Sequence, residues 1–161
     1  MTEIQTLPAV VHEVTVPAPA ERTFAAYTQE QHRWIAEDHW LGESRPAAVV
    51  LEPRPGGRWY ERAADGTESD WGTVLEWDPP GRIVLRWMVG VVDGGWGFDP
   101  DPGHGSRVEL TFTPTDDGRT VVRLEHTGFE AHGAGARIIH GGVGGTDGWP
   151  ADLAGLVAHA A

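Results

Sequence analysis

Hydrophobic and polar residues alternate most clearly between residues 52 and 87. From Trp71 to Trp77, every second position forms one apolar and aromatic face that includes Leu75, and the alternation resumes from Ile83 to Trp87. The intervening Asp78-Pro79-Pro80-Gly81 contains the Pro-Gly pair that favours a type II turn. The pattern therefore predicts three successive antiparallel strands, with Leu75 facing the same side as Trp71 and Trp77.

The same period of two predicts four further strands outside this meander. They cover residues 10–16, 46–53, 108–112 and 122–126. His12 is the polar exception on the apolar face of the first strand. With the meander, the chain is expected to form seven antiparallel strands.

Helical signals precede and follow the strands. Pro19 and Glu21 suit the first turn of a helix in which Phe24 and Tyr27 form the buried stripe, and a second short helix is expected over residues 30–35. Near the end, apolar residues with i, i+3, i+4 spacing predict a closing helix that begins at about Trp149 or Pro150 and reaches Ala158.

Two segments are unusually rich in glycine. Residues 90–105 interleave glycines with Trp96 and Phe98, which indicates either a disordered insertion or a flap over a pocket mouth. Between Gly133 and Gly148 there are seven glycines, and each costs a helix about 1 kcal/mol relative to alanine. A broken or mobile segment is expected there; helix, loop and a reactive target stay open as its role.

Length and composition restrict the possibilities further. The 161 residues fit one domain, which we assign to residues 10–161 after a tail over residues 1–9. The 24 acidic residues outnumber 12 arginines, and lysine is absent, so nucleic acid and anionic membranes are disfavoured as partners. The lack of lysine and cysteine excludes Schiff-base catalysis, thiol nucleophiles and disulfides. With no signal peptide and no apolar run of about 18 residues, we expect a cytoplasmic protein, either a monomer or a homodimer.

Motifs for common chemistry are missing. The eight histidines show no HExxH or HxH spacing, so we expect no metal. Ser44, Ser69 and Ser106 lack the context of a nucleophile elbow, and no phosphate-binding GxxxxGK[ST] occurs. We therefore expect no cofactor.

Three motifs carry a resemblance to a known superfamily. PxPGGRWYER, DGTxxxWGxVLxxDPPxRIVLxW and GRTxVxLEHxGF resemble the SRPBCC (START/Bet v1-like) superfamily, and most closely its AHSA1-like branch, named after the activator of Hsp90 ATPase. The resemblance extends from Val10 to Pro150. It implies an α+β helix-grip fold, in which a curved seven-stranded antiparallel sheet, two short helices and a C-terminal helix surround an elongated cavity.

The resemblance also implies that Trp59 and Glu61 point into this cavity. Large aromatic side chains could stack on a polycyclic or hydrophobic ligand, or could simply fill the core. Glu61 and His126 are the candidate catalytic acid and base, with His12 as a further polar group, although each could equally be inert. The expected ligand-binding residues are Trp59, Glu61, Trp71, Leu75, Leu85, Trp87, Trp96, Phe98, Leu110, Phe112, Leu124, His126, His140 and Trp149.

Three functions follow from the resemblance. The leading hypothesis is a non-enzymatic protein that binds a hydrophobic or aromatic small molecule, such as a polyketide or enediyne, in biosynthesis or self-resistance. In the latter case the glycines from Gly133 to Gly148 could be sacrificial targets, because loss of a glycine Cα hydrogen gives a stabilised backbone radical. The alternatives are a polyketide cyclase or dehydratase that uses Glu61 and His126, and a protein partner of Hsp90. Whether the protein is an enzyme stays open.

Overall fold

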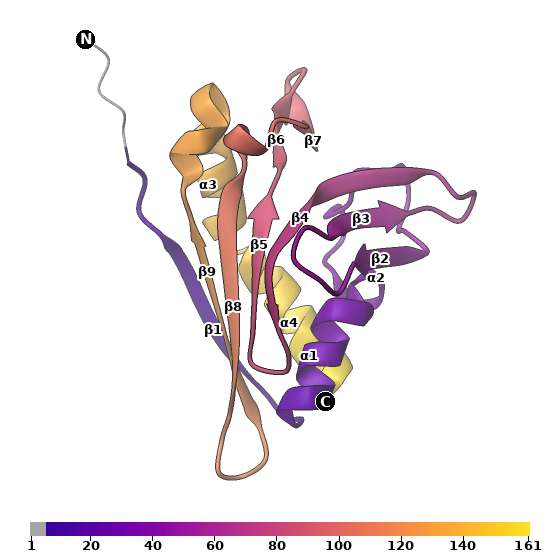
Figure 1. Ribbon diagram of the computed structural model, residues 1–161, viewed down its shortest axis with the longest axis vertical. Coiled ribbons are helices and arrows are strands. Elements are labelled where there is room, and N and C mark those ends of the chain that lie inside the picture. The colour runs from indigo at the N-terminus through magenta and orange to yellow at the C-terminus, as the bar shows by residue number, and fades with distance from the viewer. Residues whose placement is uncertain (1–5) are drawn as a thin grey trace.

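A seven-stranded antiparallel sheet dominates the computed structural model, which describes residues 6–161. The strand order is β1-β9-β8-β5-β4-β3-β2. The strands are β1 (Val10–Val16), β2 (Ala48–Leu51), β3 (Arg58–Arg62), β4 (Glu68–Asp78), β5 (Arg82–Trp87), β8 (Ser106–Pro114) and β9 (Thr120–Thr127). The sheet bends strongly, so that β2 and β3 run across the direction of β8 and β9 (Figure 1).

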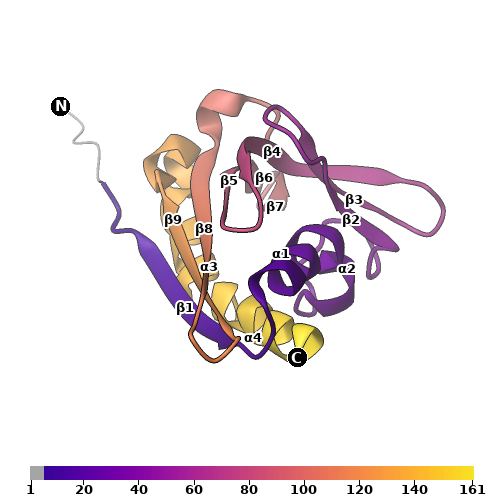
Figure 2. The ribbon, with the colours of Figure 1, turned by 60° about the horizontal axis from the view of Figure 1, so that its bottom comes forward.

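Helices cover the concave side of this sheet. They are α1 (Ala20–Gln29), α2 (Gln31–Trp34), α3 (Ala136–Gly144) and α4 (Trp149–Ala160), with 3-10 turns η1 (Pro102–His104) and η2 (Phe129–Gly135). The long closing helix α4 lies across the sheet beside α1 (Figures 1 and 2). The predicted helix-grip fold is thus confirmed.

The core forms where α1 meets the sheet. Phe24 and Tyr27 are buried, as their spacing predicted, and Phe24 packs edge-on against Trp77 and Phe112 with centroid distances of 5.4 and 5.2 Å. Leu110 behind them is fully buried. Such interlocked aromatic pairs fix the position of α1, whose end leads into α2.

A bulge in β4 makes the prediction for Leu75 wrong. The pairing of β4 with β5 shifts register between Val74 and Glu76. Val74, at 1% exposure, takes the inward position opposite Leu85, and Leu75 is left half-buried on the strand. An extra residue in one strand reverses the facing of the side chains that follow, which period-two reasoning does not detect.

The turn between β4 and β5 also differs from the prediction. The hairpin is confirmed, and the Gly81 amide donates to the Asp78 carbonyl at 3.1 Å. The Pro79–Pro80 peptide bond is cis, and Gly81 does not have a positive φ. The predicted type II turn is therefore wrong, because that turn needs a positive φ at its third residue, the position predicted for Gly81.

The first glycine-rich segment is largely ordered secondary structure rather than an irregular loop. It forms the hairpin of β6 (Val89–Val92) and β7 (Gly95–Phe98), followed by η1. Asp93 and Gly94 connect the two strands with φ values of 51° and 81°. Two consecutive positive φ angles are typical of a type I′ hairpin turn, for which an Asp-Gly pair is well suited.

The second glycine-rich segment is broken but contains a helix. The chain kinks at Gly133, where φ is 66°, and again over residues 145–148, while α3 runs between the two breaks. Gly141, Gly142 and Gly144 all lie within α3. No helix within residues 6–161 is long and apolar enough to cross a membrane.

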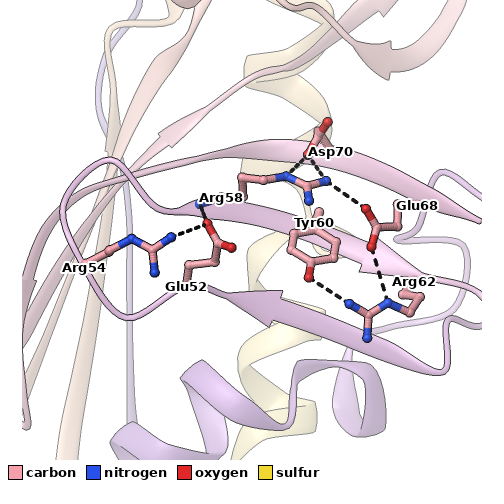
Figure 3. A network of polar contacts seen from close by, with 7 residues as sticks. All are labelled: Glu52, Arg54, Arg58, Tyr60, Arg62, Glu68 and Asp70. Atoms are coloured by element: carbon pink, nitrogen blue, oxygen red, sulfur yellow. Dashed lines mark hydrogen bonds and ion pairs between the residues drawn. The ribbon is translucent and has the colours of Figure 1, made fainter. Parts of the chain in front are cut away.

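The side chains of β3 alternate between an outer face and an inner face. Arg58, Tyr60 and Arg62 point away from the concave side, where Arg58 pairs with Glu68 and Asp70 and its guanidinium lies 3.9 Å from the Tyr60 ring centroid (Figure 3). The alternate residues Trp59 and Glu61 consequently point inward. Trp59 and Glu61 thus share the inner face of β3, although only Trp59 lines the cavity.

Candidate functional site

A cavity of about 360 Å³ lies between the sheet and the helices. Seven of the eight tryptophans line it, namely Trp34, Trp40, Trp59, Trp71, Trp87, Trp96 and Trp149. The eighth, Trp77, packs against Phe24 outside the lining. This volume falls within the range of small-molecule sites, which are mostly apolar with a few polar groups.

The sheet side of the cavity is a set of interlocked indoles. Trp59 on β3 contacts Trp71 on β4 and Trp87 at the end of β5 edge-on, with centroid distances of 5.5 and 5.8 Å. Trp87 contacts Trp149, the first residue of α4, at 5.2 Å. Because each ring holds its neighbour, contacts within the protein fix the positions of the rings in this aromatic wall.

Trp96 closes one side of the cavity from the β6–β7 hairpin. It lines the cavity although 45% of its surface is exposed. Its ring lies against α3 at Gly142, where a Cβ atom would approach Trp96 Cζ2 to 2.5 Å. Glycine at position 142 therefore makes this contact possible.

Glu61 lies behind the aromatic wall rather than in it. Its carboxylate accepts hydrogen bonds from the backbone amides of Leu41 and Gly42 and, at 2.8 Å, from Trp71 Nε1. These donors come from the loop after α2 and from β4. Glu61 thus anchors two residues that line the cavity, Leu41 and Trp71, without lining it itself.

His126 is fully buried in a chain of hydrogen bonds. Trp149 Nε1 donates to its Nδ1 at 3.0 Å, so Nε2 carries the proton and donates to Ser106 Oγ at 2.7 Å. The Ser106 hydroxyl then donates to His132 Nε2 at 2.7 Å. Burial lowers the pKa of His126 to about 3, with smaller contributions from His132 and His140. His126 is therefore a neutral group that orients Trp149.

Of the fourteen residues predicted to bind a ligand, five line the cavity. These are Trp59, Trp71, Trp87, Trp96 and Trp149. The other nine lie elsewhere: Glu61, Leu75, Leu85, Phe98, Leu110, Phe112, Leu124, His126 and His140. Leu85, Leu110 and Leu124 form the buried core, and His140 bonds the Pro8 carbonyl at 3.0 Å. Glu61 is linked to the cavity through Trp71 and His126 through Trp149, and no hydrogen bond joins Glu61 to His126 within residues 6–161.

The helical side of the cavity has polar groups that the sequence patterns did not indicate. The lining includes Tyr27, Gln31, Asp38, His39, Asp147 and Asp152. His39 Nδ1 lies 2.8 Å from Asp152 Oδ1, which also accepts the Ala36 amide at 2.9 Å. The hydrogen bond to Asp152 raises the pKa of His39 above its usual value, aided by Asp147 and opposed by partial burial.

No sequence signal would have paired His39 with Asp152. They are 113 positions apart, His39 lies in a loop without periodicity, and Asp152 occupies the first turn of α4, where an acid is common for helix-dipole reasons. Residues 6–161 contain no group of three potential metal ligands. The cavity combines a wall of aromatic side chains with a second wall that contains acidic side chains and a histidine.

Comparisons with known proteins agree with this architecture. A family model described as Activator of Hsp90 ATPase homolog 1-like protein matches residues 17–161. Among curated proteins, none matches the chain.

Several solved structures are similar over nearly the whole chain. An anthrahydroquino-γ-pyrone synthase, Txn09, complexed with SUM, is 36% identical with a TM-score of 0.66, covering 97% of this chain and 98% of its own. CalC from Micromonospora echinospora, a self-sacrificing resistance protein, is 27% identical with a TM-score of 0.69, covering 95% and 94%. Protein MLL2253 from Mesorhizobium loti is 25% identical with a TM-score of 0.64, covering 94% and 95%.

Proposed function

Since its family model matches residues 17–161, the chain belongs to the Activator of Hsp90 ATPase homolog 1-like family, and we propose that it binds a hydrophobic or aromatic small molecule in the tryptophan-lined cavity. The observation that carries this proposal is the gathering of seven of eight tryptophans around one cavity of about 360 Å³. A protein that needed tryptophan only as core filler would bury these rings against one another without leaving such a space.

The ligand class is a polyketide or enediyne-type metabolite, and the role is in biosynthesis or self-resistance. Two similar proteins support this part of the proposal: Txn09 is a synthase of a fused aromatic pyrone, and CalC is a resistance protein. Fused aromatic rings suit a wall of edge-to-face indoles, because flat π-systems and apolar edges are complementary to it.

Tryptophan fluorescence tests the proposal directly. Titration with a panel that includes a hydroxyanthraquinone and an enediyne should give saturable quenching. The Trp96→Ala variant, which removes an exposed lining ring, should weaken binding by about 3- to 10-fold, equivalent to about 1 kcal/mol. Trp77→Phe, outside the lining, should bind like the wild type. Absence of quenching across the panel would refute the proposal.

A sacrificial role in resistance is the second candidate, favoured by a specific feature of the glycine-rich segment. Gly142 and Gly148 line the cavity, whereas the other five glycines from Gly133 to Gly148 do not. A radical generated by a bound enediyne would therefore meet these two Cα hydrogens first. Intact-mass analysis after incubation with an activated enediyne should show cleavage at position 142 or 148. Unchanged mass with retained quenching would leave a carrier without self-sacrifice.

An enzyme and an Hsp90 partner are the remaining functions. The resemblance to Txn09, a synthase, supports turnover, although Glu61 and His126 use their hydrogen-bonding atoms within the protein. An Hsp90 partnership is supported by the family description alone. An unchanged ATPase rate of a cognate Hsp90 in the presence of the protein would remove it.

A further inference from the structure

The His39–Asp152 pair has the geometry of a general base and its orienting carboxylate. Nδ1 of His39 faces Asp152 Oδ1 at 2.8 Å, and the Ala36 amide holds that same oxygen in place. His39 lines the aromatic cavity, where its ring also faces the backbone of Asp147. We propose that His39 transfers a proton to and from an enolisable aromatic ketone bound in this cavity, with Asp152 as its positioning residue. This inference rests on the proposed binding function.

Tyr27 supplies a donor for the oxygen on which negative charge would develop. It is buried, lines the same cavity, and its hydroxyl has no hydrogen bond within residues 6–161. Burial, and then the charge of Asp152, raise the pKa of Tyr27 well above its usual value. The hydroxyl therefore keeps its proton and can donate it in a hydrogen bond to an enolate oxygen.

Gln31 is a second donor on this wall. Trp59 Nε1 donates to Gln31 Oε1 at 3.2 Å, which fixes the orientation of the side-chain amide. The amide nitrogen Nε2 is then buried with no protein partner among residues 6–161. A buried amide N–H without an acceptor is unfavourable, and a carbonyl oxygen of a ligand could satisfy it. Both donors lie on the helical side, as does His39.

The chemical step is a balanced proton transfer. His39 Nε2 takes a proton from the carbon next to the carbonyl, the electron pair of that C–H bond forms the carbon–carbon double bond of an enolate, and the carbonyl π pair moves onto oxygen. The proton on Nδ1 stays on His39 and remains hydrogen-bonded to Asp152. The imidazolium is therefore held between the Asp152 carboxylate and the enolate. Return of the proton to carbon restores the ketone and neutral His39. No oxidant, metal or co-reactant is needed.

The pH dependence of this step follows from the groups that face His39. These are Asp152 on α4 and Asp147 in the turn between α3 and α4, and both raise the pKa of His39. The neutral, basic form of His39 therefore predominates only at a pH higher than the usual pKa of histidine. The rate should rise with pH through that point, and Asp152→Asn should move the midpoint to lower pH.

The experiment measures exchange of the C1 hydrogens of 2-tetralone with D2O by NMR, alongside tryptophan quenching by the same compound. The wild type should accelerate exchange about 100-fold at saturation over buffer. His39→Gln retains an amide that can reach Asp152 but cannot take a proton, so it should bind 2-tetralone and exchange at the buffer rate. His104→Gln is the matched control, because His104 also pairs with a carboxylate, Asp99, at 2.9 Å but lies outside the cavity lining.

The outcomes separate the two proposals. Acceleration by the wild type and His104→Gln, its loss in His39→Gln, and a midpoint shifted by Asp152→Asn would support the inference. Quenching without acceleration, or acceleration that survives in His39→Gln, would overturn it and leave the binding function intact. No quenching by 2-tetralone or by the polyketide panel would refute the binding function and with it this inference.

Discussion

Every hydrogen-bonding atom of the His126 ring has a partner inside the protein, and the ring has no exposed surface. Protonation would place a second N–H on Nδ1, directly opposite the Trp149 Nε1–H that now donates to it. Both burial and this conflict favour the neutral ring, consistent with its pKa of about 3. Protonation of His126 thus disfavours the folded state of the protein.

This opposition predicts how stability depends on pH. Between pH 6.5 and 3, the unfolded chain holds a proton on His126 that the folded protein does not, so the stability that this group contributes is present above pH 6.5 and lost as pH falls. Its share of the loss between about pH 7 and about pH 5.5 should be about 1 kcal/mol. Urea denaturation of the wild type and His126→Gln at both pH values measures this share as the difference in their pH dependence.

A control with the opposite sign is available at His39. Its pKa is raised in the folded protein, so its contribution is present at low pH and lost as pH rises through the raised value. Removing it in His39→Gln should make acidification more destabilising than in the wild type, the reverse of His126→Gln. Identical pH dependence in the wild type and His126→Gln would contradict the assignment of a neutral, buried His126.

At the scale of elements, α3 is helical although its high glycine content disfavours a helix. Gly141, Gly142 and Gly144 each weaken it by about 1 kcal/mol, so packing must supply what propensity does not. Ile139 and Val143 provide the buried face. Gly142 serves a separate purpose, because it lets the Trp96 ring of the neighbouring hairpin lie against the helix.

Substitutions at two adjacent glycines distinguish the effect of helix propensity from the effect of the contact with Trp96. Gly142→Ala would place a Cβ 2.5 Å from Trp96 Cζ2, whereas a Cβ at Gly141 meets nothing within 4 Å. Gly141→Ala should raise stability by up to about 1 kcal/mol and leave ligand affinity unchanged. Gly142→Ala should displace Trp96, red-shift tryptophan emission and weaken binding by about 3- to 10-fold. Wild-type affinity in Gly142→Ala would show that Trp96 does not contribute to the cavity.

Periodic elements were predictable and the cavity's polar wall was not. The seven strands and α1 follow from alternation and helical spacing. Alternation also placed Trp59 and Glu61 on one face, and the family resemblance indicated that this face is the inner one. An inward direction does not distinguish a lining residue from one behind the lining, and Glu61 is behind it. The bulge at Leu75 and the pairing of His39 with Asp152 depend on three-dimensional register and on a long loop, for which one sequence has no periodic signal.

At the scale of the whole molecule, charge is distributed unevenly around the cavity. The chain has a formal net charge of −12 and no lysine. Among residues 6–161, the lining includes Asp38, Asp147 and Asp152 but no arginine, and His39 is its one basic group. Asp38 and Asp147 form no ion pair within residues 6–161. The electrostatic potential of the cavity therefore favours positive charge on an aromatic ligand, and tryptophan faces add a cation–π attraction.

Three naphthalene compounds of matched size test this preference. Among 2-naphthylmethylamine, 2-naphthalenemethanol and 2-naphthoate, affinity measured by tryptophan quenching should be highest for the amine and lowest for the carboxylate. Amine and alcohol should differ by roughly 3- to 5-fold at low salt, and less as salt screens the charges. Raising the pH removes the His39 proton, makes the cavity more negative and should widen the difference.

Asp147 provides the variant that locates the effect. Asp147→Asn removes one lining carboxylate and should weaken binding of the amine without changing binding of the alcohol. Asp65→Asn, in the turn between β3 and β4, removes the same charge from the surface away from the lining and should alter neither. If both variants reduced amine binding equally, the preference would arise from the net charge of the whole protein. If neither did, while the amine still bound more tightly, Asp147 would not be the source of the preference, which would then come from the tryptophan faces and the other lining carboxylates.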